Sequence, residues 1–138
     1  MDTSVLVAIF AKEAIAIDLV TFLKREGTSM ATVSVWGVTE FAAATSFKYT
    51  QGFIDAPLRE AARTNFASAQ SGLFNLVSVE TSDFLRAANF ANDASLRLRG
   101  GDALHLGIAA RFNLPILTLD NRMKAAAQSL GMGVVDYH

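Results

Sequence analysis

The sequence has no cysteine, only two prolines and two histidines, and no excess of charge of either sign. The lack of cysteine excludes disulfide bonds, thiolate nucleophiles and zinc–thiolate sites, and it fits a reducing compartment, so we expect a cytoplasmic protein. Twelve Lys and Arg against 13 Asp and Glu give a net charge of -1, so no general basic field attracts nucleic acid. A polyanionic partner must therefore bind to a local basic patch.

The chain also lacks a long apolar run. Val5 to Ala11 is too short to cross a bilayer and follows no basic segment, so we expect neither a membrane span nor a signal peptide. The 138 residues suit one domain, and we expect a single domain over 1–138. Hydrophobic residues make up 51% of the chain, which is high for so small a domain. We therefore predict an apolar face buried against a partner, such as a homodimer contact.

Hydrophobic spacing and capping residues predict helices that alternate with short strands. Val5–Phe10 fits either a buried strand or the start of a helix. The expected helices are Lys12–Glu26 ended by Gly27, one from Ser34 to about Tyr49, one from Asp55 to Gly72, one from Thr81 or Ser82 through Phe90, one from Asp102 to near Asn113, and one after Asp120 to Leu130. The expected strands are Met30–Val33, Phe74–Val79, Ile116–Leu119 and, at an edge, Val134–Asp136, with a loop over Asn92–Gly101. This alternation indicates an α/β sandwich with a mainly parallel sheet.

Four carboxylates stand in apolar surroundings. Asp120 follows Ile116–Leu119, so it should lie at the C-terminal end of a strand, where ligands bind in α/β sheets. Asp2 precedes an apolar run, Asp102 opens an apolar helix, and Glu40 lies within another. Four converging acids would repel one another and raise their pKa values unless a divalent cation such as Mg²⁺ or Mn²⁺ neutralised them. The set therefore predicts a metal site.

Four short segments resemble the acidic motifs of PIN domains, in the usual order and over nearly the whole chain. They are Asp2-Thr3-Ser4, Thr39-Glu40-Phe41, Gly101-Asp102-Ala103-Leu104-His105-Leu106 and Thr118-Leu119-Asp120. The third is the most specific, and the sequence most resembles VapC-type toxins of bacterial toxin–antitoxin pairs. The resemblance implies a three-layer α/β/α sandwich and an endoribonuclease that depends on Mg²⁺ or Mn²⁺, in which the metal activates a water to attack the phosphodiester.

The resemblance also implies site residues and partners. The implied metal ligands, direct or through water, are Asp2, Glu40, Asp102 and Asp120. The hydroxyl groups expected to bond to a carboxylate or to a metal-bound water are those of Ser4 and Thr118. RNA is the implied substrate, and a cognate antitoxin whose C-terminal segment lies in the active-site groove is the implied inhibitor. A homodimer is the implied assembly.

Several residues have a structural alternative to a functional role. Asp102 and Asp120 fit helix N-caps, and Glu40 fits a buried acid paired with an arginine. His105 can face the same groove as Asp102, although a histidine in an apolar helix is more often a hydrogen-bonded core residue. Trp36 and the ten Phe residues are expected in the core. The basic residues near the third and fourth acids fit either RNA phosphate contacts or a solvated surface: Arg97, Arg99, Arg122 and Lys124.

Two positions depart from the family pattern. In the family the first acid ends a central strand, but here only Met1 precedes Asp2, so we expect that strand to be nearly absent, as in a truncated chain, and activity to suffer. The amino group of Met1 would also lie beside the metal ligands and compete with the cation. Asn121 stands where many relatives carry another acid, which favours one metal ion over two.

Two other functions compete with RNA cleavage. One is a catalytically impaired PIN-like module that dimerises and binds an antitoxin or RNA. Replacing Asp102 with Asn separates these two hypotheses, because it should abolish cleavage and leave binding mostly intact. The other is a phosphoaspartate receiver domain, which is disfavoured because the first strand has no adjacent acid pair and no lysine closes a late strand.

Overall fold

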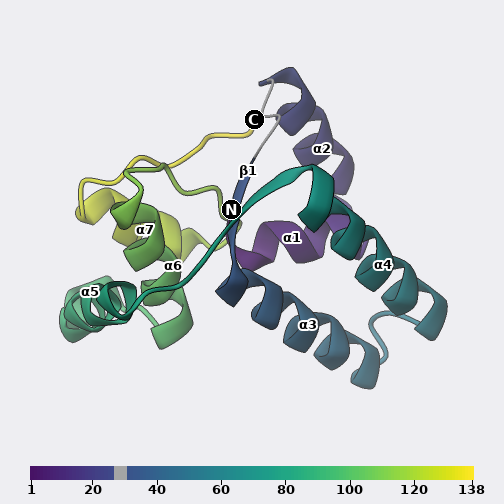
Figure 1. The fold of residues 1–138 in the computed structure, drawn as a ribbon, viewed down its shortest axis with the longest axis horizontal. Coiled ribbons are helices and arrows are strands. Elements are labelled where there is room, and N and C mark those ends of the chain that lie inside the picture. The colour runs from purple at the N-terminus through teal and green to yellow at the C-terminus, as the bar shows by residue number, and fades with distance from the viewer. Residues whose placement is uncertain (27–30) are drawn as a thin grey trace.

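Two groups of helices flank a small parallel sheet in the computed structural model of the chain, which describes residues 1–26 and 31–138 (Figure 1). The first half contains α1 (Thr3–Phe10), α2 (Ala16–Arg25), β1 (Ala31–Ser34), α3 (Val35–Thr50) and α4 (Ala56–Gly72). The second half contains β2 (Phe74–Val77), α5 (Thr81–Asn92), the 3₁₀ helix η1 (Ala94–Leu96), α6 (Gly100–Arg111) and α7 (Asn121–Ser129). Helices α1 to α4 lie to one side of β1, and α5 to α7 lie to the other.

The strands pair in parallel, with Val33 of β1 opposite Leu76 of β2. A second parallel contact outside the named strands joins Ile116 to Val134. The fold is therefore of the α/β class that the sequence predicted, with a small parallel sheet. The layered arrangement follows because helices cover both sides of the parallel strands.

The predicted strands at Ile116–Leu119 and Val134–Asp136 were wrong in extent, because only their single bridge forms. On the side away from Val134, the segment 116–119 contacts the chain just before α1. There the Asp2 N–H donates to the Leu117 carbonyl at 3.1 Å. One such bond does not make a ladder, which requires successive pairs along two strands.

Short-range capping signals predicted three of the six expected helix starts correctly, those of α3, α4 and α7. Ser34 accepts a hydrogen bond from the Gly37 N–H, and Asp55 accepts one from the Leu58 N–H, so α3 and α4 begin where expected. The Val5–Phe10 ambiguity resolves as a helix, since Asp2 caps α1.

Three boundaries and one loop differ from the prediction. Helix α2 begins at Ala16, because Lys12 has a φ of 56° and residues 12–15 turn the chain after α1. The cap of α5 is Glu80 instead of Thr81 or Ser82. The expected loop over Asn92–Gly101 contains η1, and α6 begins at Gly100, two residues before Asp102. Gly27 and Met30, which the sequence placed in a cap and a strand, lie outside the described residues.

The core lies on both sides of the sheet. Between α1, α3 and α4, the tilted rings of Phe41 and Phe66 pack with centroids 4.1 Å apart. Between α6 and α7, Leu106 packs beside Met123. The prediction that all phenylalanines are core was wrong, since three are more than half exposed: Phe47, Phe53 and Phe84. Within the described chain, no helix combines the length and the apolar character needed to cross a membrane.

Candidate active site

One hollow of about 460 Å³ is lined by all four acids that the sequence singled out. Asp2 precedes α1, Glu40 lies within α3, Asp102 is the third residue of α6, and Asp120 precedes α7. The fold thus brings together side chains that are up to 118 positions apart in the sequence. Three of them stand at helix starts, where the helix dipole and free N–H groups favour negative charge.

Asp2 is fixed on both carboxylate oxygens. Ser4 donates its hydroxyl to Oδ1 at 2.7 Å, and Thr118 donates its hydroxyl to Oδ2 at 2.7 Å. The residue is only 3% exposed. These bonds hold the carboxylate in one orientation, because rotation would break a short hydrogen bond on either side.

Glu40 is held through one oxygen by two side chains. His105 Nε2 lies 2.5 Å from Oε2, and Thr3 donates its hydroxyl to the same atom at 2.6 Å. Burial opposes the charge of Glu40, but the bonds from His105 and Thr3 outweigh it and hold the pKa of this carboxyl below its ordinary value. The alternative of an arginine partner was wrong, because the partner of Glu40 is His105.

His105 therefore serves both structure and site. It is 6% exposed within an apolar helix, as a core histidine would be, yet it contacts an acid that lines the hollow. Its Nε2 also lies 3.3 Å from the Thr3 hydroxyl, so three side chains from α1, α3 and α6 form one connected group.

Asp102 is held less fully by the described protein than the other three acids. Among the described residues Asp102 accepts only a long bond, 3.4 Å, from the Arg99 N–H. It is the third residue of α6, whose cap is Arg99, so the structural alternative of an N-cap was wrong for Asp102. Burial raises the pKa of Asp102, and the negative charge of Asp120 raises it further. Asp120 does cap α7, since its Oδ1 accepts from the Arg122 N–H at 2.7 Å.

The donor set suits a hard divalent cation, because carboxylate oxygens are the ligands that Mg²⁺ and Mn²⁺ prefer. The repulsion between Asp102 and Asp120 is what a cation between them would relieve. In the described parts of the chain, however, no three His, Asp or Glu side chains already stand as a ready group of metal ligands. Asp2 is bonded on both oxygens and Glu40 on one, whereas Asp102 accepts only one long bond within the described residues, so Asp102 is the most available of the four acids.

The four basic candidates separate in the structure. Arg122 lies 3.7 Å from Asp120 Oδ2, and with Arg97 it lines a second hollow beside α7. Lys124 instead lies over the Tyr137 ring, 5.0 Å from its centroid. Arg99 directly precedes α6. None of the four lines the acidic hollow itself.

Sequence reasoning named Thr3 and Gly101 only as parts of motifs. Thr3 proves to contact Glu40, and Gly101 approaches Glu40 so closely that a Cβ there would lie 2.7 Å from Oε1. The glycine beside the third acid was a hint that the backbone there approaches another group closely. The group is Glu40, 61 positions away, and no local sequence pattern identifies it.

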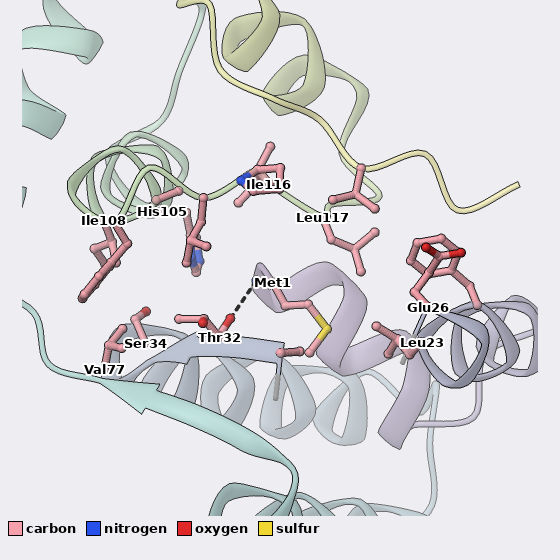
Figure 2. Close-up of a pocket in the computed structure, with 17 residues that line it drawn as sticks. Met1, Leu23, Glu26, Thr32, Ser34, Val77, His105, Ile108, Ile116 and Leu117 are labelled. Carbon is pink, nitrogen blue, oxygen red and sulfur yellow. Dashed lines mark hydrogen bonds between the residues drawn. The ribbon is translucent and has the colours of Figure 1, made fainter. Parts of the chain in front are cut away.

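Another cavity, of about 310 Å³, lies between β1 and the segment 114–117; because its lining is mainly apolar, we call it the apolar slot (Figure 2). Met1 donates its amino group to the Thr32 carbonyl at 2.9 Å, and burial lowers the pKa of that amine. Met1 lines this apolar slot and is not among the residues of the acidic hollow. The amine therefore lies outside the acidic hollow, although the charge of Asp2, one of the predicted ligands, still acts on it and raises its pKa. His105 lines both cavities.

The fold and the hollow define an α/β protein with an acidic, hydroxyl-supported site. Residues 1–128 match the family model described as PIN domain, and the chain belongs to the PIN domain family. PIN domains are generally nucleases that act on phosphodiester bonds, and they usually use divalent metals and bind RNA. A comparison with curated protein sequences gives no match.

Proposed function

We propose that this protein is an endoribonuclease that depends on Mg²⁺ or Mn²⁺. The observation that carries the proposal is the convergence of Asp2, Glu40, Asp102 and Asp120 on one hollow, in a family that is generally composed of nucleases. A bound divalent ion would activate a water for attack on the phosphodiester and stabilise the charge that develops on phosphate.

The side chains of the hollow divide this work. Asp102 and Asp120 would bind the ion, because Asp102 accepts only one long bond from the described protein and the charge of Asp120 raises its pKa when no cation is bound. Asp2 and Glu40 would act through water, since hydroxyl groups already hold both oxygens of Asp2, and a hydroxyl and an imidazole hold one oxygen of Glu40. Keeping Glu40 ionised adds negative charge that favours the cation at neutral pH. One ion is expected, because Asn121 cannot supply a further carboxylate.

Titration of Mn²⁺ with a panel of structured RNAs tests the nuclease. Wild type should cleave only when the metal is present, and Asp102→Asn should not cleave. Asp18→Asn is the matched control, since Asp18 is an exposed acid on α2 outside the hollow, and it should cleave like wild type. Equal cleavage by wild type and Asp102→Asn would contradict the assignment of the site.

The role of a toxin held in check by an antitoxin is part of the same proposal. Phe47 lines the acidic hollow and is 61% exposed, and nearby in sequence Phe53 is 71% exposed. An inhibitor segment with apolar side chains would bury these rings while it covers the acids. Expression of wild type should then slow the growth of a bacterial host, whereas expression of Asp102→Asn should not.

A homodimer is proposed from the remaining apolar surface. Phe84 and Leu85 on α5 are 55% and 64% exposed, and side chains of this kind are commonly covered in an interface. Sedimentation of wild type beside Leu85→Glu tests this, with a dimer expected for wild type and a monomer for the variant.

A binding module without catalysis is the second candidate. It is favoured by the lack of a ready three-acid ligand group in the described residues and by the hydrogen bonds that occupy Asp2 and Glu40. Under this hypothesis wild type and Asp102→Asn should bind RNA or an antitoxin with equal affinity, and neither should cleave RNA with Mn²⁺.

A further inference from the structure

A basic hollow lies beside the acidic one. It has a volume of about 420 Å³ and is formed between η1 and α7. Its polar lining consists of Ser95, Arg97, Asn121, Arg122 and Ser129. The two arginines, the Ser129 hydroxyl and the Asn121 amide are hydrogen-bond donors that suit an anion, whereas the Ser95 hydroxyl already donates to Asp93.

The two hollows meet at the first turn of α7. Asp120 and Met123 line the acidic hollow, whereas Asn121 and Arg122 line the basic one. The Arg122 guanidinium lies 3.7 Å from Asp120 Oδ2, so it marks the border between them. A nucleic-acid strand whose scissile phosphate lies at the acids would therefore carry a neighbouring phosphate towards these arginines.

Arg97 is available for such a phosphate. Among the described residues its guanidinium has neither a carboxylate partner nor an aromatic ring, whereas Arg111 is bound to both Asp83 and Glu80. The acid in the same loop, Asp93, accepts hydrogen bonds from the N–H and hydroxyl of Ser95 at 3.0 and 2.6 Å.

Arg97 also has an unfavourable backbone conformation. Its φ is 51°, in the left-handed region, which costs a residue with a side chain about 1–2 kcal/mol. Strain of this kind persists only where the surrounding structure imposes it, and it is frequent at binding sites. The buried Leu96 beside it anchors the turn that holds this conformation.

We propose that the basic hollow binds a backbone phosphate of the RNA strand next to the one that is cleaved. This inference rests on the proposed nuclease function and adds the place where the strand is held. A guanidinium group binds two phosphate oxygens at once, and the Ser129 hydroxyl and Asn121 amide can supply neutral bonds to the same phosphate. The contact is with the backbone, so it holds the strand without selecting its sequence.

The test compares Arg97→Gly with Arg63→Ala. Glycine removes the cation and relieves the left-handed strain, so the variant should fold at least as well as wild type, which a thermal melt checks. Arg63 is an exposed arginine on α4 that pairs with Glu60, away from both hollows, and it controls for the loss of one positive charge.

Binding of a fluorescent single-stranded RNA is measured by anisotropy, in EDTA to prevent cleavage, over a series of salt concentrations. Arg97→Gly should weaken binding about fivefold, as expected for one exposed ionic contact. The slope of log K against log salt should become shallower by about 0.7, the value for one phosphate contact to a single strand. In cleavage with Mn²⁺, the same variant should raise KM and leave kcat within about twofold.

Three results would overturn the proposal. Arg97→Gly could bind with the affinity and salt slope of wild type, or Arg63→Ala could lose as much as Arg97→Gly. In either case metal-dependent cleavage by wild type would leave the nuclease assignment standing and the phosphate site rejected. If wild type neither binds nor cleaves any RNA, the proposed function fails first, and this inference fails with it.

Discussion

Replacing Gly101 with alanine tests whether the position of Glu40 controls the site. A Cβ at residue 101 would lie 2.7 Å from Glu40 Oε1, and ordinary contact begins at 3.4 Å, so the carboxylate must retreat by about 0.7 Å. The retreat is resisted, because Oε2 of the same carboxylate is bonded to His105 and Thr3 at 2.5 and 2.6 Å. The new methyl group therefore displaces the Glu40 carboxylate from a position that His105 and Thr3 fix.

A misplacement of about 1 Å can slow an enzyme about 100-fold, so Gly101→Ala should lose roughly 10- to 100-fold of the Mn²⁺-dependent cleavage rate. Stability should not fall in parallel, since alanine in a helix is favoured over glycine by about 0.5–1 kcal/mol. Gly100→Ala is the matched control. It makes the same substitution one residue earlier in α6, where a Cβ would meet no atom within 4 Å.

Cleavage rates at saturating Mn²⁺ and thermal melts followed by circular dichroism measure both effects. Gly100→Ala should cleave like wild type, and Gly101→Ala should be slow while melting at a similar temperature. The reasoning is refuted if the two alanine variants cleave equally fast. It is also refuted if Gly101→Ala loses activity only because it is largely unfolded at the assay temperature.

Two further predictions concern stability. Asp83 is fully buried and bonded to Arg111 at 2.9 Å, so Asp83→Asn should lower the free energy of unfolding by about 3 kcal/mol in urea titrations. Burial opposes the charge of Asp83, but Arg111 holds the pKa of this carboxyl below its ordinary value. The stabilisation is therefore present above the unfolded-state pKa of about 3.9 and is lost in stronger acid. There the free energies of unfolding of wild type and Asp83→Asn should converge. Fusing Val-Ile-Val-Ile ahead of Met1 should fill the apolar slot and raise Tm above that of a Gly-Ser-Gly-Ser fusion; equal Tm values would show that the slot accepts no strand.

Local chemistry explains how much of the fold could be predicted. Caps such as Ser34 and Asp55 act on N–H groups three residues ahead, so the sequence contains the whole interaction. Asp120 likewise caps the helix that follows it, and its place at the end of an apolar run located it in the hollow. The α/β class and the convergence of the four acids follow from such local signals together with the motif order.

Interactions between distant segments could not be predicted in the same way. The bond between His105 and Glu40 joins residues 65 positions apart, and no periodicity distinguishes it from an ordinary core contact. The helix at Val5–Phe10 depends on Asp2 as a cap, although the run itself fits a strand equally well. The exposure of Phe47, near the end of α3, likewise depends on which elements pack beside that helix, and the sequence does not show this.

The environment of Asp102 predicts that one substitution there has two different effects: it maintains or raises the stability of the metal-free protein, and it removes the stabilisation by Mn²⁺. Burial and the charge of Asp120 raise the pKa of Asp102, so its ionised form opposes folding at neutral pH when no metal is bound. Asp102→Asn removes that charge, and the metal-free variant should melt at or above the temperature of wild type. Mn²⁺ should raise the Tm of wild type, because a ligand that binds only the folded state stabilises it, and should leave the variant unchanged. A variant that melts lower than wild type and still gains stability from Mn²⁺ would show that Asp102 is a structural acid and that the cation binds elsewhere.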